Sequence, residues 1–164
     1  MTEAAASSAD RKSEFDRVVS PIAARVRRGL VAEFGVEIGS DVAAEAVAWA
    51  WEHLDRLAVM TNPAGYLYRV GQLAARRHLR WQRGRTPFPA GPTWATANVP
   101  EFDEAMMSAL RMLKSGQRVA VVLVHGYGFS YREVAELLGV SEAAVTNHLH
   151  RGLTKLRTIL EEER

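Results

Sequence analysis

The sequence predicts an all-α protein made of two small helical domains joined by a proline-rich linker. Apolar residues recur at three- and four-residue spacing, as on one face of a helix, and strand-like alternation is scarce. Aromatic residues make up only 8% of the 164 residues, whereas Ala, Leu, Arg and Glu dominate. Four of the six prolines fall within GRTPFPAGPTWATANVP, a composition typical of an extended linker. The predicted organisation is a disordered tail at 1–12, a helical domain at 13–83, the linker at 84–100 and a second helical domain at 101–164.

Composition excludes several classes of protein. The chain has no cysteine, so disulfides and thiolate metal sites are excluded. No apolar stretch approaches the roughly 20 residues that span a bilayer, and the N-terminus lacks the basic start and apolar run of a secretory signal. We therefore expect a soluble, cytoplasmic protein with no membrane partner.

The first domain opens with a helical pattern that extends from Ser13, a plausible cap, to Phe34. Pro21 lies inside this pattern and should kink or split the helix, because proline lacks the N–H that bonds to the preceding turn. Gly35 and Gly39 are then predicted to bracket a loop.

A second helix is predicted over DVAAEAVAWAWEHLDRL, with Ser40 or Asp41 as its cap. Its apolar surface, which includes Trp49 and Trp51, is wider than one small core needs. One of the two tryptophans is expected to be an ordinary core residue. An exposed tryptophan would suit a protein interface, where this residue often contributes much of the binding energy.

The next helix, PAGYLYRVGQLAARRHLRWQRGR, should open at Asn62-Pro63, because a missing N–H costs little in a first turn. Its predicted apolar face includes Leu67 and Leu73. Between positions 62 and 85 there is no acidic residue, and the arginine and aromatic residues are Arg69, Arg76, Arg77, Arg80, Arg83, Arg85, Tyr66, Tyr68 and Trp81. Arginines neutralise phosphates, and aromatic rings can stack on unpaired bases at roughly 1–3 kcal/mol per base. A charge run is most often a solvated surface, but this pattern favours nucleic-acid binding.

The second domain begins with an apolar pattern over residues 102–113 and continues with VAVVLVHGYGF. This run is rich in β-branched residues and could pass for a strand. We predict a buried helix instead, because the run has no second strand to pair with.

The most informative stretch is SYREVAELLGVSEAAVTNHLHRGLTKLRTIL, which starts at Ser130. It predicts two helices joined by a tight turn at Gly139, with Ser141 capping the second helix. Their apolar stripes are Tyr131, Val134, Ala135 and Leu138, then Val145, Leu149, Leu153, Leu156 and Leu160. Such a helix-turn-helix fits its second helix into the DNA major groove. A purely structural hairpin is the alternative, but the small residue Ala135, where the helices must approach closely, favours DNA binding.

This layout resembles the sigma-70 family of bacterial RNA polymerase sigma factors, in its extracytoplasmic-function (ECF) group. Members of that group have two helical domains, region 2 and region 4, joined by a flexible linker. The strongest match starts at Gln117, where QRVAVVLVHGYGFSYREVAELLGVSEAAVTNHLHRGLTKLR is similar to region 4 along nearly its full length. The segments DVAAEAVAWAWEHLDRL and PAGYLYRVGQLAARRHLR are a weaker match to region 2. Together these matches cover most of residues 13–160.

The resemblance implies a transcription initiation subunit whose partners are core RNA polymerase and promoter DNA, and it allows for an anti-sigma factor. The implied polymerase-binding residues are Asp41, Glu45, Trp49 and Glu52. The arginine-rich helix would contact and help open the downstream promoter element through Arg69, Arg76, Arg77, Arg80, Trp81 and Arg83. The residues implied to contact the upstream element are Arg132, Ser141, Glu142, Ala144, Thr146, Asn147, His148 and Arg151. Asparagine can pair with adenine, glutamate can accept from cytosine, and arginine can hold the backbone.

Several positions depart from the family's pattern. Thr146 and His148 stand where the family usually has Lys and Arg, so phosphate attraction should be weaker and less salt-dependent. Leu73 and Arg77 stand at the usual Asn and Asp positions of the helix that opens the promoter, and Ala44 replaces a glutamine of the polymerase-docking helix. Either the chain reads a divergent promoter, or promoter melting is weakened or lost.

Three interpretations stay open at the level of sequence. The first is an alternative sigma factor with no catalysis of its own. The second is a sigma-derived DNA-binding regulator that does not recruit polymerase productively, and the third is an interaction module that holds polymerase or an anti-sigma partner and binds DNA poorly. An enzyme is not indicated, and we expect no cofactor or metal, because no nucleophile–base pair, metal-ligand cluster or phosphate-cradling glycine loop stands out.

Overall fold

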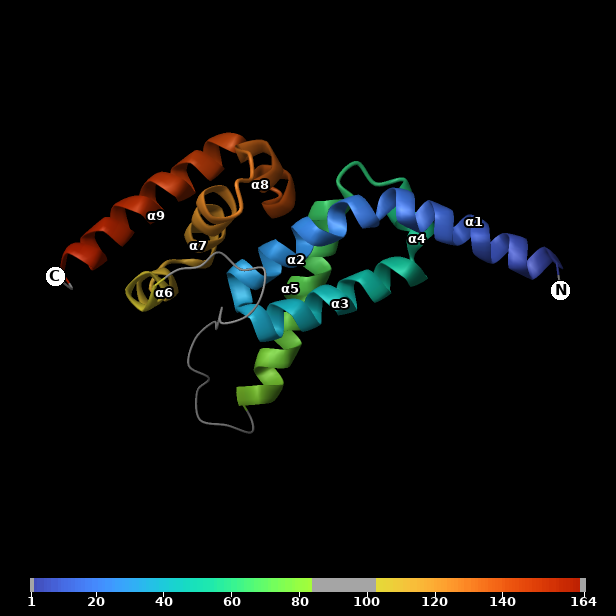
Figure 1. Ribbon diagram of the computed structural model, residues 1–164, viewed down its shortest axis with the longest axis horizontal. Helices are drawn as coiled ribbons and strands as arrows, with labels where there is room; N and C mark the ends of the chain where they lie inside the picture. Colours follow the sequence, from blue (N-terminus) through green and yellow to red (C-terminus); the bar gives the residue numbers. More distant parts are fainter. Residues whose placement is uncertain (1, 84–102, 163–164) are drawn as a thin grey trace.

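The computed structural model describes residues 2–83 and 103–162, and every regular element in these two ranges is a helix (Figure 1). The N-terminal module contains α1 (Thr2–Val18), α2 (Ser20–Phe34), α3 (Val36–Glu52), α4 (Leu54–Ala58) and α5 (Pro63–Arg83). The C-terminal module contains α6 (Glu104–Arg111), α7 (Ser115–Val121), the π-helical turn η1 (Val122–Gly126), α8 (Tyr131–Leu138) and α9 (Glu142–Glu162). The predicted all-α fold is confirmed. The predicted linker lies outside the described residues, and none of the described helices is long and apolar enough to cross a membrane.

The first predicted helix is split near Pro21, as expected. The first segment, α1, ends before Val19, and Pro21 lies in the first turn of α2. The N–H groups of a first turn have no partner within the helix, so the N–H that proline lacks is not needed there. The prediction of a disordered tail over residues 1–12 differs from the structure, in which these residues from Thr2 onward belong to α1. The guanidinium of Arg11 donates to the Trp51 carbonyl oxygen at 2.7 Å and lies over the Trp51 ring, so α1 packs against the end of α3.

The predicted loop between Gly35 and Gly39 is wrong. Only Gly35 interrupts the chain, at a φ of 85°, and α3 starts at the next residue. Gly39 lies inside α3, where an added Cβ would come within 2.5 Å of the Val31 Cα. The missing side chain lets α2 and α3 pack in close contact, so α3 begins before the Ser40 or Asp41 cap that the sequence predicted.

The buried face of α5 also differs in part from the prediction. Leu67 is buried as expected, but Leu73 is 59% exposed, because the buried stripe runs through positions 64, 67, 68, 71, 74 and 75, on the other side of the helix. Tyr68 is only 2% exposed, and its hydroxyl donates to the Glu33 carboxylate. Tyr68 is therefore a core residue and cannot stack on bases in this structure.

The predicted helix-turn-helix is confirmed in the C-terminal module. The run VAVVLVHG forms the end of α7 and η1, as a buried helical segment. Ser130 caps α8 in a reciprocal arrangement with Glu133, and Gly139 ends α8 in the left-handed conformation, at a φ of 65°. Two residues of the predicted stripes point outward instead, since Tyr131 is 43% and Leu153 is 38% exposed.

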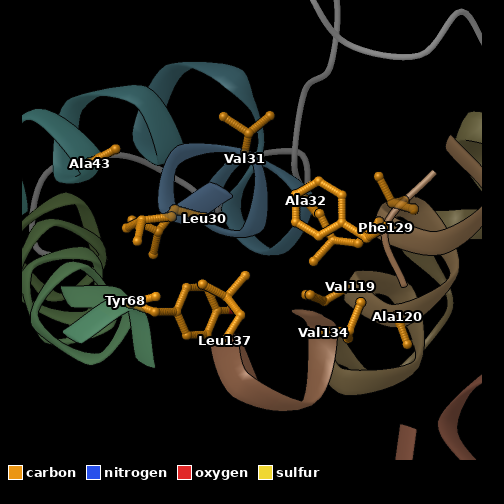
Figure 2. Close-up of a cluster of buried hydrophobic side chains, with 14 of the residues drawn as sticks. Leu30, Val31, Ala32, Ala43, Tyr68, Val119, Ala120, Phe129, Val134 and Leu137 are labelled. Carbon is orange, nitrogen blue, oxygen red and sulfur yellow. The ribbon is translucent and has the colours of Figure 1, made fainter. Parts of the chain in front are cut away.

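The two modules share one continuous hydrophobic core. In Figure 2, Leu137 of α8 lies beside Tyr68 of α5, and Phe129 and Val119 belong to the same cluster. A Cβ added at Gly29 of α2 would lie 2.5 Å from Leu137 Cδ2 and 3.0 Å from the Tyr68 ring. Helices α2, α5 and α8 therefore meet without a gap at this point.

Candidate nucleic-acid interface

The start of α9 is fixed by the turn that precedes it. The Ser141 Oγ accepts the Ala144 N–H at 3.1 Å, which confirms Ser141 as the cap predicted from sequence. Ala135 of α8 and Val145 of α9 are buried where the two helices meet. The first three turns of α9 are thereby held on a rigid hairpin with their outer face turned to solvent.

Most residues predicted to read the upstream element lie on this outer face. Those exposed on α9 or its cap are Ser141, Glu142, Thr146, Asn147 and Arg151. The Thr146 hydroxyl donates to the Glu142 carbonyl oxygen at 3.0 Å, and Ala144 is half-buried. Arg132 of α8 is also exposed, with its Nε 3.3 Å from a carboxylate oxygen of Glu136 on the next turn. The six exposed side chains are all polar, and half of them carry a charge.

His148 lies apart from these residues. Its side chain is half-buried, and a Cβ added at Gly116 of α7 would lie 3.0 Å from the His148 ring. The imidazole lines a cavity of about 170 Å³ together with Glu33 and Gln72 of the N-terminal module. The structure thus turns His148 toward the space between the modules, away from Asn147.

A second exposed polar surface follows α5. Its solvent-exposed members are Arg69, Arg76, Arg77, Arg80 and Trp81, while the side chain of Arg83 lies outside the described part of the chain. Trp81 is 63% exposed. One carboxylate of α3, Glu45, lies 3.4 Å from Arg77 Nη2 and 2.5 Å from His78 Nε2. Glu45 therefore offsets part of the positive charge of this surface.

The predicted polymerase-binding residues lie along α3. Asp41, Glu45 and Glu52 are exposed, whereas Trp49 is half-buried. The Trp49 ring stacks on the His53 imidazole, with centroids 4.2 Å apart and planes 8° from parallel, and lies 5.2 Å from the Tyr66 ring.

The neighbouring Trp51 is the more exposed of the two tryptophans, at 40%. The Phe15 ring packs edge-on against it at 5.1 Å. Of the two tryptophans, Trp51 is therefore the exposed one, whereas Trp49 is half-buried.

The sequence interpretation assigned no role to Arg118, which is buried in this structure. The guanidinium is 8% exposed and donates from Nε to the Ala32 carbonyl oxygen at 3.1 Å and from Nη2 to the Glu33 carbonyl oxygen at 2.8 Å. Burial lowers the pKa of Arg118, and the nearby Glu33 carboxylate and Tyr68 act in the opposite direction. Burial also raises the pKa of Tyr68, and the Glu33 charge adds to that increase. The signal in the sequence is an arginine directly before the apolar run that starts at Val119.

Two exposed surfaces of the described residues carry groups of the kinds that contact nucleic acids. The α9 face offers groups that hydrogen-bond to base edges, and the α5 face offers arginines with an exposed indole. Within residues 2–83 and 103–162, no three His, Asp or Glu side chains are grouped as a metal site would require.

Comparison with curated proteins links the chain to sigma factors. Residues 103–156 match the family model described as sigma-70, region 4. The chain is 33% identical over 104 residues to RNA polymerase sigma factor CarQ of Myxococcus xanthus, which is 59% of this chain and 60% of that protein. It is 43% identical over 56 residues to RNA polymerase sigma-E factor of Streptomyces antibioticus, which is 34% of this chain and 31% of that protein. The chain thus spans less than two thirds of the length of either relative.

Two solved structures share its fold. The sigma factor RpoE of Bartonella quintana, solved in complex with the anti-sigma factor NepR, matches with a TM-score of 0.63 and 21% identity over 92% of this chain and 98% of that chain. CnrH, solved in complex with the cytosolic domain of CnrY, matches with a TM-score of 0.57 and 22% identity over 92% of this chain and 89% of that chain. Residues 103–156 are thus similar to region 4 of the sigma-70 family, part of the chain is similar to two RNA polymerase sigma factors, and the fold is that of the solved RpoE and CnrH.

Proposed function

We propose that this chain is an alternative, ECF-type sigma factor that binds core RNA polymerase in the cytoplasm and directs it to promoters. It has no catalysis of its own and uses no cofactor in this proposal. The observation that carries the proposal is the capped helix-turn-helix, whose second helix exposes Thr146, Asn147 and Arg151 on one side. The separate arginine surface on α5 is the feature that a simple duplex-binding regulator would not need.

In this proposal, α9 reads the upstream promoter element in the major groove. The Asn147 amide can make a bidentate pair with adenine, and the Glu142 carboxylate can accept from the amino group of cytosine. Arg132 and Arg151, which are both exposed, are proposed to hold phosphates. Ser141 serves as the cap that aims the helix. His148 could join this contact only by leaving its place against Gly116.

The arginine surface of α5 is proposed to bind the downstream element as it opens. Guanidinium groups hold the phosphates of a separated strand, and the exposed Trp81 indole gives an unpaired base a surface on which to stack. Leu73 is exposed among these arginines and adds an apolar contact where the family usually has a polar one.

The exposed acids of α3, Asp41, Glu45 and Glu52, with Trp49 beside them, are proposed to dock on core RNA polymerase. Gel filtration of the chain with core polymerase tests this step. The double substitution D41A/E52A should reduce co-elution. As a matched control, D55A removes an exposed acid of α4 and should leave it unchanged. Equal co-elution of both variants would refute the assignment of this surface.

One protein of similar fold, the sigma factor RpoE, was solved in complex with the anti-sigma factor NepR. We propose that a protein of that class also binds this chain.

A duplex-binding regulator that does not open DNA is the second candidate. The exposed Leu73 and the Glu45–Arg77 ion pair favour it, because both weaken the polar surface that a melting helix needs. The two candidates differ in transcription: with core polymerase, the sigma factor gives a transcript and the regulator gives none. The regulator binds duplex DNA without core polymerase.

A further inference from the structure

His150 lies at the centre of the exposed face of α9. The buried stripe of this helix runs through positions 145, 149, 152, 156 and 159. Because a helix turns by about 100° per residue, Asn147, His150 and Thr154 fall on the opposite side, and all three are exposed. His150 is therefore about one turn from Asn147, on the same face of the helix.

The other histidine of α9 has a different environment. His148 is half-buried and lines the cavity that Glu33 and Gln72 also line, whereas His150 is exposed to solvent. The two residues are neighbours in sequence, but only His150 can meet a DNA duplex on the outer face of α9 without a rearrangement.

The outer face of α9 carries little net charge when its histidines are neutral. Over residues 142–152 the other charged side chains are Glu142 and Arg151, and their formal charges cancel. Lys155, further along the helix, donates to the Met112 carbonyl oxygen at 2.7 Å and is thereby held against the end of α6. A single proton on His150 therefore changes the reading face from neutral to positive.

The residues next to His150 on the helix surface are uncharged. The neighbours of a helical residue lie three and four positions away, and here they are Thr146, Asn147, Leu153 and Thr154. No carboxylate of α9 is therefore one turn away from the His150 ring.

Helices α6, α7 and α8 pack against α9, and each of their charged side chains has a partner within the protein. The pairs are Glu104 with Arg111, Glu133 with the Ser130 N–H, Glu136 with Arg132 and Arg25, and Arg118 with the carbonyl oxygens of Ala32, Glu33 and Leu113. Since these charges are compensated internally, a DNA phosphate is the natural partner of a protonated His150.

We infer that His150 contacts DNA and takes up a proton from solvent when α9 binds a duplex, so that binding tightens as the pH falls. The inference rests on the proposed role of α9 as the reading helix and adds a pH dependence to it. Histidine is the side chain that ordinarily changes its charge between about pH 5 and 8, and a phosphate beside the ring favours the protonated form. Mildly acid conditions would therefore strengthen the hold of this chain on DNA.

Fluorescence anisotropy of a labelled random-sequence duplex tests the inference, because attraction to phosphates does not depend on base sequence. Uptake of one proton changes an affinity by at most about tenfold per pH unit, so the full chain should bind roughly three- to tenfold tighter at about pH 5.5 than at about pH 7.5. One further phosphate contact should also steepen the dependence of log affinity on log salt by about 0.9 at the lower pH.

Substitutions of single histidines identify the group that takes up the proton. H150Q should lose the pH dependence and the added salt dependence, whereas H150K, which is charged at both pH values, should bind tightly at both. H125Q removes an exposed histidine of η1 and is the matched control, with the pH dependence of wild type. The inference is overturned if H150Q keeps the wild-type pH dependence, if H148Q or H78Q removes it instead, or if no form binds the duplex.

Run-off transcription with core polymerase distinguishes a failure of this inference from a failure of the proposed function. Transcripts from wild type, together with an unchanged pH dependence of duplex binding in H150Q, would overturn the role of His150 and leave the sigma-factor proposal intact. Loss of the pH dependence in H150Q, with no transcript from any form, would support the His150 contact and refute the sigma-factor proposal.

Discussion

The substitution G29A gives a quantitative test of the contact between the modules, because it has two opposite effects on the free energy of unfolding. Glycine inside a helix costs roughly 0.5–1 kcal/mol relative to alanine, so G29A should by itself stabilise α2. However, the new Cβ would lie 2.5 Å from Leu137 Cδ2 and 3.0 Å from a Tyr68 ring carbon. Both neighbours are 2% exposed, and the Tyr68 hydroxyl is held by Glu33, so the ring cannot swing aside freely.

The expected outcome is a net loss of stability. Overpacking a filled core typically costs about 1–3 kcal/mol, which exceeds the helix term, so G29A should lower the free energy of unfolding by about 1 kcal/mol. Urea denaturation followed by circular dichroism measures this loss.

The control for this prediction is A24G, at an exposed position of the same helix. A24G measures only the cost of glycine relative to alanine inside a helix, and it should lower the free energy of unfolding by roughly 0.5–1 kcal/mol. If G29A proves more stable than wild type by the amount that A24G loses, there is no clash at Gly29, and the close packing of α2 on α8 is wrong.

Three further predictions concern the proposed surfaces and the α8 cap. N147A should relax base preference at one promoter position by ~1–3 kcal/mol in binding titrations, whereas uniform weakening on all sequences would mean a backbone contact only. Replacing the exposed α5 residues Arg76, Arg77 and Arg80 with alanine should abolish promoter opening, measured by the permanganate reactivity of thymines, and should leave binding to the upstream duplex unchanged. If promoter opening is unchanged, this surface does not bind the downstream element. The Ser130 N–H donates to Glu133 and lowers the pKa of that carboxyl below its usual range. This stabilisation is present above the unfolded-state pKa and is lost as pH falls through the lower folded-state pKa. The free energy of unfolding of E133Q should therefore fall less than that of wild type when pH drops from about 5 to 3, and parallel pH profiles would contradict the assignment.

Much of the fold follows from local signals in the sequence. Pro21 and Pro63 mark helix starts, because a missing N–H is tolerated only there, and Gly139 with Ser141 defines the turn of the hairpin. The exposed face of α9 follows from helical periodicity once Val145 and Leu149 are assigned to the core.

The errors arise where residues far apart in sequence meet. The start of α3 depends on the close approach of Gly39 to Val31, which removes the expected loop. Tyr68 can be buried because its hydroxyl donates a hydrogen bond to Glu33, which lies 35 residues earlier in the sequence. Arg118 bonds to carbonyls 85 and 86 residues away, and periodicity within α7 carries no information about them.

Run-off transcription from sheared genomic DNA, with core polymerase alone and with this chain added at saturation, tests the central claim most directly. If the chain is a sigma factor, discrete transcripts should appear only when it is present, and the triple arginine variant of α5 should give none. If wild-type chain co-elutes with core polymerase yet yields no discrete transcript, its role is to hold polymerase rather than to initiate, and the proposed function is wrong.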